Sequence, residues 1–308
     1  MADDLVTPLL PRASDFLWSP YGYIPTEYVC IIFIVLFGIS TFTHTVEAIF
    51  LRTWWLLPTA CLAGALEVLG WAGRLWSSDN ITGVQPFQIQ ITATILAPTP
   101  LVAANFIILG RIIARLGPTY SRLSPKWYTI VFLSCDIVAL VVQGVGGGMA
   151  SSAAGSGRDP SLGGRVMLGG IAFQLVAIAV YAVCALEFYL RYLWDRPLDS
   201  EVPKPIHGDR DATRGIFTSR LKFMSAGLAF STLCVFIRSV YRTIELADGW
   251  GGRIITTEVY FNVLDGAMIV LAMYTLNVAN PGFLLTREKG EGERSVEEEK
   301  RPASSSSQ

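Results

Sequence analysis

Seven long, mostly apolar runs constrain most strongly what this chain can fold into. They cover residues 27–51, 54–76, 87–115, 127–151, 165–193, 221–244 and 256–280. A helix of about 20 apolar residues crosses the hydrocarbon core of a bilayer, and each run is long enough to do so. Charged residues make up only 16% of the chain, against about 25% in ordinary soluble domains. The sequence therefore predicts an all-α, polytopic membrane protein, a bundle of seven transmembrane helices.

The domain organisation follows from these runs. Residues 1–26 form an N-terminal tail, residues 27–283 the transmembrane domain, and residues 284–308 a tail rich in Glu, Lys, Arg and Ser. We expect this last segment to be disordered, because it has almost nothing apolar to bury. The third run is long for a straight crossing and carries Pro98 and Pro100 near its middle, which predicts a kinked or tilted helix.

Lysine and arginine are distributed unevenly between the two ends of the predicted helices. They gather in the loop after the third run, in residues 191–222 after the fifth, and in the C-terminal tail. Because basic loops stay on the cytoplasmic side, we expect the N-terminus outside and the C-terminus in the cytoplasm. The sequon Asn80-Ile81-Thr82 then lies on the outer side, which makes Asn80 a candidate glycosylation site.

Two sets of polar residues recur with the spacing i, i+4, i+7 in the last two runs, which places each set on one helical face. They are Arg238, Arg242 and Glu245, then, after a Gly-rich turn, Glu258, Asn262 and Asp265. An ionisable side chain at the centre of a membrane helix costs at least ~2.5–3.5 kcal/mol. We therefore expect the two charged stripes to point at each other or at a water-filled cavity.

Further polar residues inside the other runs extend this pattern. Two pairs share a helical face through i, i+7 spacing, and single glutamines lie on the third and fifth runs; they are Glu67 with Arg74, Asp136 with Gln143, Gln90, and Gln174. Together with the stripes they predict a polar pocket among runs two to seven that opens at or just below the outer surface. In the outer half carboxylates outnumber arginines, so the pocket suits a cationic headgroup.

The same residues have a structural interpretation. Buried polar side chains can simply bond helices to one another, at ~0.6 kcal/mol each on average. For any single residue both interpretations stay open, whereas five acids and three arginines in adjoining runs favour a functional site. Glycines at the end of the fourth run and the start of the fifth indicate close helix packing, with a flexible outer gate as the alternative. Gly146 and Gly163 are examples.

Several chemistries have no support in the sequence. There is no G-x-x-x-x-G-K-[ST] motif and no serine-nucleophile elbow. The interior of each run lacks the lysine that a retinal Schiff base needs, since Lys222 lies at the cytoplasmic edge of the sixth run. His44 with Glu47 makes a poor metal site, so we expect His44 to serve helix packing. Carboxylates paired with arginine make poor acids, so we do not expect an enzyme. We expect no cofactor, no metal and no nucleic-acid partner, and the sequence specifies no protein partner.

A set of motifs in fixed order matches a known family over about residues 20–285. These are E-x-x-G-W-x-x-R from Glu67, Gln90 with Ala97-Pro98 and Arg111, D-x6-Q-x-x-G-G-G from Asp136, Gly169-Gly170 with Gln174, and R-x3-R-x2-E-x3-G-x2-G-x5-E-x6-D from Arg238, followed by Pro281-Gly282. In these features the chain resembles the fungal lipid-translocating exporter family, whose members include a sphingoid long-chain-base exporter and an aminocholesterol-resistance protein. The family often has tyrosine at positions 106 and 262 and histidine at 280, where this chain has Phe106, Asn262 and Asn280.

The resemblance implies export or flop of amphiphiles, sphingoid bases or phospholipids, and resistance to toxic ones at a plasma membrane. In that interpretation Glu67, Glu258 or Asp265 binds the amine, and the arginines hold those carboxylates or a phosphate. The alternative is a receptor-like seven-helix sensor of an amphiphile, which the basic segment 191–222 favours. Against it, the outer loops contain no cysteine, and Gly110-Arg111-Ile112 replaces an acidic-Arg-aromatic triplet.

Overall fold

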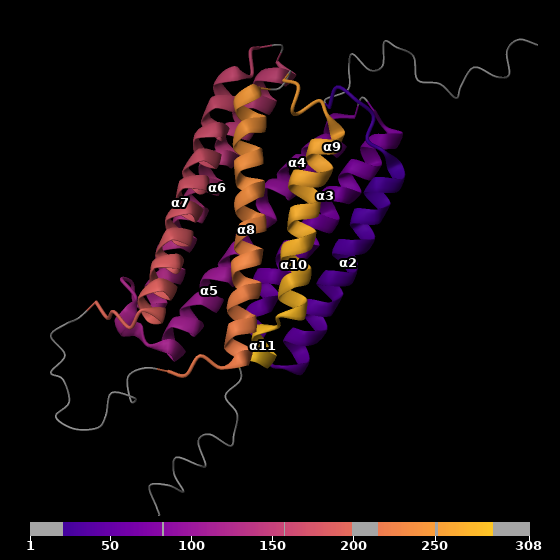
Figure 1. Cartoon of the computed structure of the whole chain (residues 1–308). Helices are drawn as coiled ribbons and strands as arrows, with labels where there is room; N and C mark the ends of the chain where they lie inside the picture. Colours follow the sequence, from indigo (N-terminus) through magenta and orange to yellow (C-terminus); the bar gives the residue numbers. More distant parts are fainter. Residues whose placement is uncertain (1–20, 82, 157, 199–214, 250–251, 286–308) are drawn as a thin grey trace, which may run out of the picture.

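The computed structural model describes residues 21–81, 83–156, 158–198, 215–249 and 252–285. Seven helical segments in this part of the chain are long and apolar enough to cross a membrane, which confirms the predicted seven-helix membrane fold. They stand side by side in one bundle (Figure 1). Most of the N-terminal tail, the middle of the basic loop and the C-terminal segment expected to be disordered lie outside the described residues.

Several of the seven segments consist of more than one helical element. The elements are α2 (Glu27–Phe50), η1 (Trp54–Leu56), η2 (Leu57–Cys61), α3 (Leu62–Asp79), α4 (Val84–Leu96), α5 (Pro98–Leu116), η3 (Pro118–Tyr120), α6 (Pro125–Gly155), α7 (Ser161–Leu193), α8 (Ser219–Asp248), α9 (Glu258–Phe261), η5 (Asn262–Ala267), α10 (Met268–Val278) and α11 (Pro281–Leu284). The third segment is interrupted at Ala97, within the stretch where the sequence predicts a kink. Pro98 lacks the N–H that would continue the ladder, and it begins a new helix instead.

Two of the elements, η2 and η5, are turns of π-helix. A π turn inserts extra backbone into a helix and often occurs at functional sites. The turn in η5 includes Asp265. It therefore changes the direction in which the last segment presents its polar side chains, relative to an uninterrupted α-helix.

Glycines set how closely certain helices approach. A Cβ atom built on Gly146 would lie 2.4 Å from the backbone nitrogen of Met167, and one on Gly163 would lie 2.3 Å from that of Ala150. The pair α6 and α7, which Figure 1 shows along one side of the bundle, therefore packs backbone to backbone, as the sequence predicts. Similarly, Gly70 of α3 faces Thr94 of α4, which brings α4 close to the charged residues described next.

Candidate functional site

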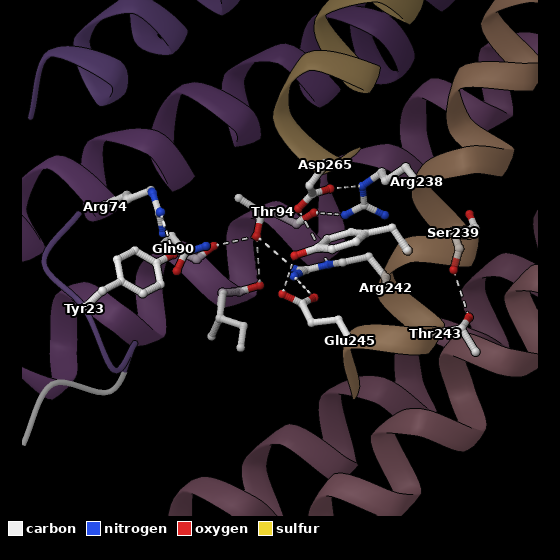
Figure 2. Close-up of polar contacts among 12 residues, drawn as sticks. Tyr23, Arg74, Gln90, Thr94, Arg238, Ser239, Arg242, Thr243, Glu245 and Asp265 are labelled. Atoms are coloured by element: carbon white, nitrogen blue, oxygen red, sulfur yellow. Dashed lines mark hydrogen bonds and ion pairs between the residues drawn. The ribbon is translucent and has the colours of Figure 1, made fainter. Parts of the chain in front are cut away.

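Five ionisable side chains from three elements meet inside the bundle. This charged cluster consists of Glu67 on α3, Arg238, Arg242 and Glu245 on α8, and Asp265 on η5. All are buried, and Glu67, Arg238 and Asp265 are only 2%, 5% and 3% exposed. Figure 2 shows four of them around Thr94 of α4.

Arg238 ties α8 to two neighbouring elements. Its Nε pairs with Oδ1 of Asp265, and its Nη2 donates to the backbone carbonyl of Thr94 over 2.5 Å. A carbonyl within a helix is free to accept a second bond through its other lone pair. Arg238 therefore joins α8, α4 and η5 at one point.

Arg242, one turn further along α8, shares the same acid and adds another. Its Nε lies 3.6 Å from Oδ2 of Asp265, and its Nη1 donates to Oε2 of Glu245 over 2.6 Å. The other Glu245 oxygen, Oε1, accepts from the hydroxyl of Tyr241 over 2.8 Å. Arg242 also donates to Thr94 Oγ1 over 3.3 Å. Both oxygens of Glu245 thus accept hydrogen bonds, whereas Asp265 is held by ion-pair contacts.

Glu67 approaches the cluster from α3. Its carboxylate lies beside Trp71 and within electrostatic range of Asp265, Arg238 and Arg242. Both arginines already pair with Asp265 or Glu245. Glu67 therefore adds a third carboxylate to two guanidinium groups.

A second charged pair lies beside the cluster, nearer the end that carries the N-terminal segment. Arg74 Nη2 lies 3.3 Å from Oε1 of Glu258 and donates to the hydroxyl of Tyr23 over 2.7 Å. Glu258 in turn accepts from the backbone nitrogen and hydroxyl of Thr26, over 2.8 and 2.7 Å. The guanidinium carbon of Arg74 is 4.6 Å from the ring centre of Phe261, within cation–π range. This pair therefore anchors residues 21–26 across the end of the bundle.

Two tyrosines of that N-terminal segment are buried against the helices. The Tyr21 hydroxyl is 3.0 Å from Ser77 Oγ, and its ring meets Phe87 edge to face at 5.0 Å. Burial raises the pKa of Tyr21 to about 12 and also raises the pKa of Tyr23. Both phenols therefore stay neutral near pH 7, and the segment adds aromatic surface without adding charge.

Two small cavities flank Arg242. One, of about 30 Å³, lies between the N-terminal segment and the cluster; its walls include Tyr23, Arg74, Gln90 and Glu245. The other, of about 10 Å³, is bounded by Arg238, Ser239, Gln143 and Gln174. Since one water needs roughly 10–15 Å³ of such volume, these spaces hold a few waters at most. The pocket predicted from the sequence is therefore nearly closed in this conformation.

Polar contacts of a different kind join α5, α6, α7 and α8. Gln143 donates to Gln174 Oε1 over 3.1 Å, and Asn105 donates to Ser231 Oγ over 3.2 Å. We call these two pairs the neutral polar contacts. Asp136 lies beside Gln174, and its Oδ2 has no hydrogen-bond partner among the described residues.

The predicted site residues are thus divided among several places. The α8 stripe does line one side of the cluster, but the second stripe does not face it as a unit: Asp265 meets Arg238 and Arg242, whereas Glu258 turns to Arg74. The π turn between them breaks the expected i, i+4, i+7 register. Asn262 Oδ1 is buried without a partner among the described residues.

Four further residues at the site were not expected from the sequence. They are Tyr23, Thr94, Tyr241 and Phe261. Thr94 follows Gln90 by four residues, Tyr241 precedes Glu245 by four and Phe261 precedes Asp265 by four, so helical spacing offered a signal for all three. Tyr23 lies before the first helix, where hydropathy gives no position.

Two residues outside the pocket also have defined surroundings. His44 is buried between α2 and α10, with Nε2 3.2 Å from the carbonyl oxygen of Met273 and Nδ1 3.5 Å from Glu47, in keeping with the predicted packing role. Asn80 is exposed after α3, while Thr82 of its sequon lies outside the described residues.

Comparisons with known proteins identify relatives. The profile of the family described as RTA1 like protein matches residues 60–288. The chain is 30% identical over 283 residues to the sphingoid long-chain base transporter RSB1 of Saccharomyces cerevisiae, covering 85% of this chain and 73% of that protein. Protein RTA1 of the same organism is 24% identical over 217 residues, 70% of this chain and 62% of RTA1. No solved structure matches the chain.

Proposed function

The chain belongs to the RTA1-like protein family, and we propose that it moves cationic single-chain amphiphiles of the sphingoid-base class across the membrane. Its relative RSB1 is named as a transporter of sphingoid long-chain bases, which supports this substrate class. Seven apolar helices make the chain an integral membrane protein; we propose the plasma membrane as its location. Removal of toxic amphiphiles there confers resistance to them.

The charge balance of the charged cluster carries this proposal. Its members are three carboxylates, Glu67, Glu245 and Asp265, and two guanidinium groups, Arg238 and Arg242. The neighbouring pair Arg74 and Glu258 adds one charge of each sign and leaves the balance unchanged. A buried carboxyl group without a counter-charge ionises only at a high cost. An ammonium headgroup beside Glu67 offsets that cost, whereas a neutral or anionic headgroup does not.

Headgroup entry requires the bundle to open. The cavity of about 30 Å³ beside the cluster is far smaller than the ~300–1,000 Å³ of ordinary ligand pockets. Residues 21–26 cover it and are held by Glu258 and Arg74. We infer that this structure is a closed conformation and that release of the N-terminal segment from Glu258 accompanies opening, a hinge-like transition around a ligand.

The test is leaflet movement of a labelled sphingoid base and, separately, of a labelled phospholipid in liposomes that contain the purified full-length chain. We expect protein-dependent movement of the sphingoid base. Glu67→Gln keeps the size and polarity of the side chain but cannot ionise beside a cationic headgroup, and we expect at least about a tenfold loss of that movement.

The matched control is Glu187→Gln. Glu187 is also a helix carboxylate held by two arginines, Arg122 and Arg191, at 2.6 and 2.7 Å, but it lies outside the cluster. We expect wild-type movement in this variant. Saturable binding of the sphingoid base with no movement would contradict transport and support a sensor. Movement of the phospholipid in preference to the base would contradict the assignment of a cationic substrate.

A further inference from the structure

A larger hollow lies on the membrane-facing side of the bundle, apart from the cavities beside Arg242. It is a groove of about 580 Å³, within the ~300–1,000 Å³ of small-molecule sites. Ile237, Val240, Tyr241 and Ile244 of α8 form one wall, and Tyr260 and Leu264 of α9 and η5 the other. Figure 1 shows α8 and the α9–α10 segment separating toward the end that carries α9.

The length of the groove matches one leaflet. It runs along α8 from Ile237 to Asp248, and the 11 steps between these residues span roughly 16 Å at ~1.5 Å per residue. The hydrocarbon core of a bilayer is ~30 Å thick, so the groove covers about half of it. An alkyl chain anchored at the membrane surface would fill it.

The chemistry along the groove changes from apolar to charged. The walls within the span are aliphatic or aromatic, whereas the end near the membrane surface carries Asp248 and Arg253, both exposed. Asp248 Oδ2 accepts from the backbone nitrogen of Ile254 over 3.1 Å. A carboxylate has room for further donors, so Asp248 can also receive an ammonium group. A long apolar trough with a carboxylate and a guanidinium at its surface end suits an amphiphile with a charged headgroup, and Asp248 provides the contact for an ammonium group.

The groove and the charged cluster lie on opposite sides of the same stretches of α8 and η5. Tyr241 and Leu264 line the groove, while the residues that follow them, Arg242 and Asp265, lie in the cluster. The Tyr241 ring is part of the groove wall, and its hydroxyl bonds Glu245 on the other side. One layer of side chains therefore separates the membrane-facing groove from the charged cluster.

We propose that this groove binds the alkyl chain of a single-chain cationic amphiphile taken from the adjacent leaflet, and that the headgroup enters the charged cluster past Tyr241. The inference rests on the proposed function and adds to it a lateral route and a tail site. The alkyl chain of the amphiphile remains in an apolar environment throughout, so only the headgroup has to cross the protein interior.

Photolabelling tests the site directly. The full-length chain is reconstituted in phosphatidylcholine nanodiscs with a sphingoid base that carries a diazirine in its alkyl chain, and adducts are mapped by mass spectrometry. We expect the groove residues Val240, Ile244 and Leu264 to be labelled about tenfold more than the exposed face of α7. Excess unlabelled sphingoid base should suppress the groove adducts. Equal labelling of both faces, insensitive to competition, would overturn the proposal.

A matched pair of variants separates the groove from the bilayer in general. Ile244 in the groove and Val180 on α7 are 50% and 49% exposed, so a tryptophan at either position is similarly tolerated by the fold. We expect Ile244→Trp to lower both groove labelling and leaflet movement about tenfold, and Val180→Trp to leave both unchanged. Two further outcomes distinguish the proposed tail site from the proposed transport function.

Specific groove labelling without any leaflet movement would uphold the tail site while contradicting the proposed transport. Leaflet movement that Ile244→Trp leaves intact, together with uniform labelling, would overturn the tail site while the proposed transport stands.

Discussion

The charged cluster and the neutral polar contacts both bury polar side chains within membrane-spanning helices, but only the contacts are balanced. Gln143 with Gln174, and Asn105 with Ser231, match donors to acceptors between neighbouring helices. The cluster sets three carboxylates against two guanidinium groups. Polarity in a membrane helix therefore does not by itself mark a site. We propose that the charged cluster does, because it contains one more acidic than basic side chain and a cationic ligand can supply the missing positive charge.

The largest effect should follow from worsening the imbalance. Arg238→Ala removes one of the two arginines that contact Asp265 and the bond to the Thr94 carbonyl. Breaking a buried ion pair costs about 3–5 kcal/mol, so we expect a strongly lowered unfolding temperature in detergent and no leaflet movement. Adding Asp265→Asn to this variant restores the wild-type difference of one acid over the arginines in the cluster, and it should recover part of the thermal stability. If Arg238→Ala alone had wild-type stability and wild-type leaflet movement, the assignment of the pocket would be refuted.

A mid-sized effect should come from disturbing the α6–α7 interface without touching any charge. Gly163→Ala forces a Cβ atom to within 2.3 Å of a backbone nitrogen of α6, and such overpacking costs about 1–3 kcal/mol. We expect lower thermal stability but an unchanged preference for the amine among the molecules that fold.

The control for this change is Gly148→Ala, where a Cβ atom has no neighbour within 4 Å. It should be neutral or slightly stabilising, because alanine favours the helix. A changed headgroup preference in Gly163→Ala would show that the α6–α7 interface is part of the site. That result would support the alternative in which these glycines form a flexible outer gate.

The smallest effect should come from a neutral polar contact. Ser231→Ala removes the hydroxyl that Asn105 contacts at 3.2 Å. Side-chain hydrogen bonds between membrane helices average ~0.6 kcal/mol, so thermal unfolding should shift only slightly and movement should stay near wild type. Loss of movement at unchanged stability would extend the site into this contact and weaken the distinction between the two regions.

The fold was predictable because each membrane crossing is recorded in the sequence as one continuous apolar run. Lipid imposes about 20 apolar residues on every crossing, and Pro98 marks its own helix break at Ala97. The family was also predictable, since ordered motifs such as Glu67 to Arg74 retain their spacing, and the family match confirms it. The orientation of the termini stays a prediction based on the basic loops.

The pairings within the site were not predictable to the same degree. A π turn at Asn262–Ala267 turns Glu258 and Asp265 toward different partners, and nothing in the sequence distinguishes that turn from an α-helix. Contacts to backbone, such as Arg238 with the Thr94 carbonyl, leave no trace in residue types. Tyr23 reaches Arg74 from outside the spans, where periodicity has no meaning.

The most direct test of the central claim is equilibrium binding of a sphingoid base and of its N-acetyl derivative, which keeps the alkyl chain but has no charge. Wild-type protein should prefer the free amine by at least about tenfold. Glu67→Gln should abolish that preference while binding the N-acetyl compound as the wild type does. If Glu67→Gln keeps the full preference for the amine, Glu67 is not the headgroup site, which contradicts the proposed role of the charged cluster.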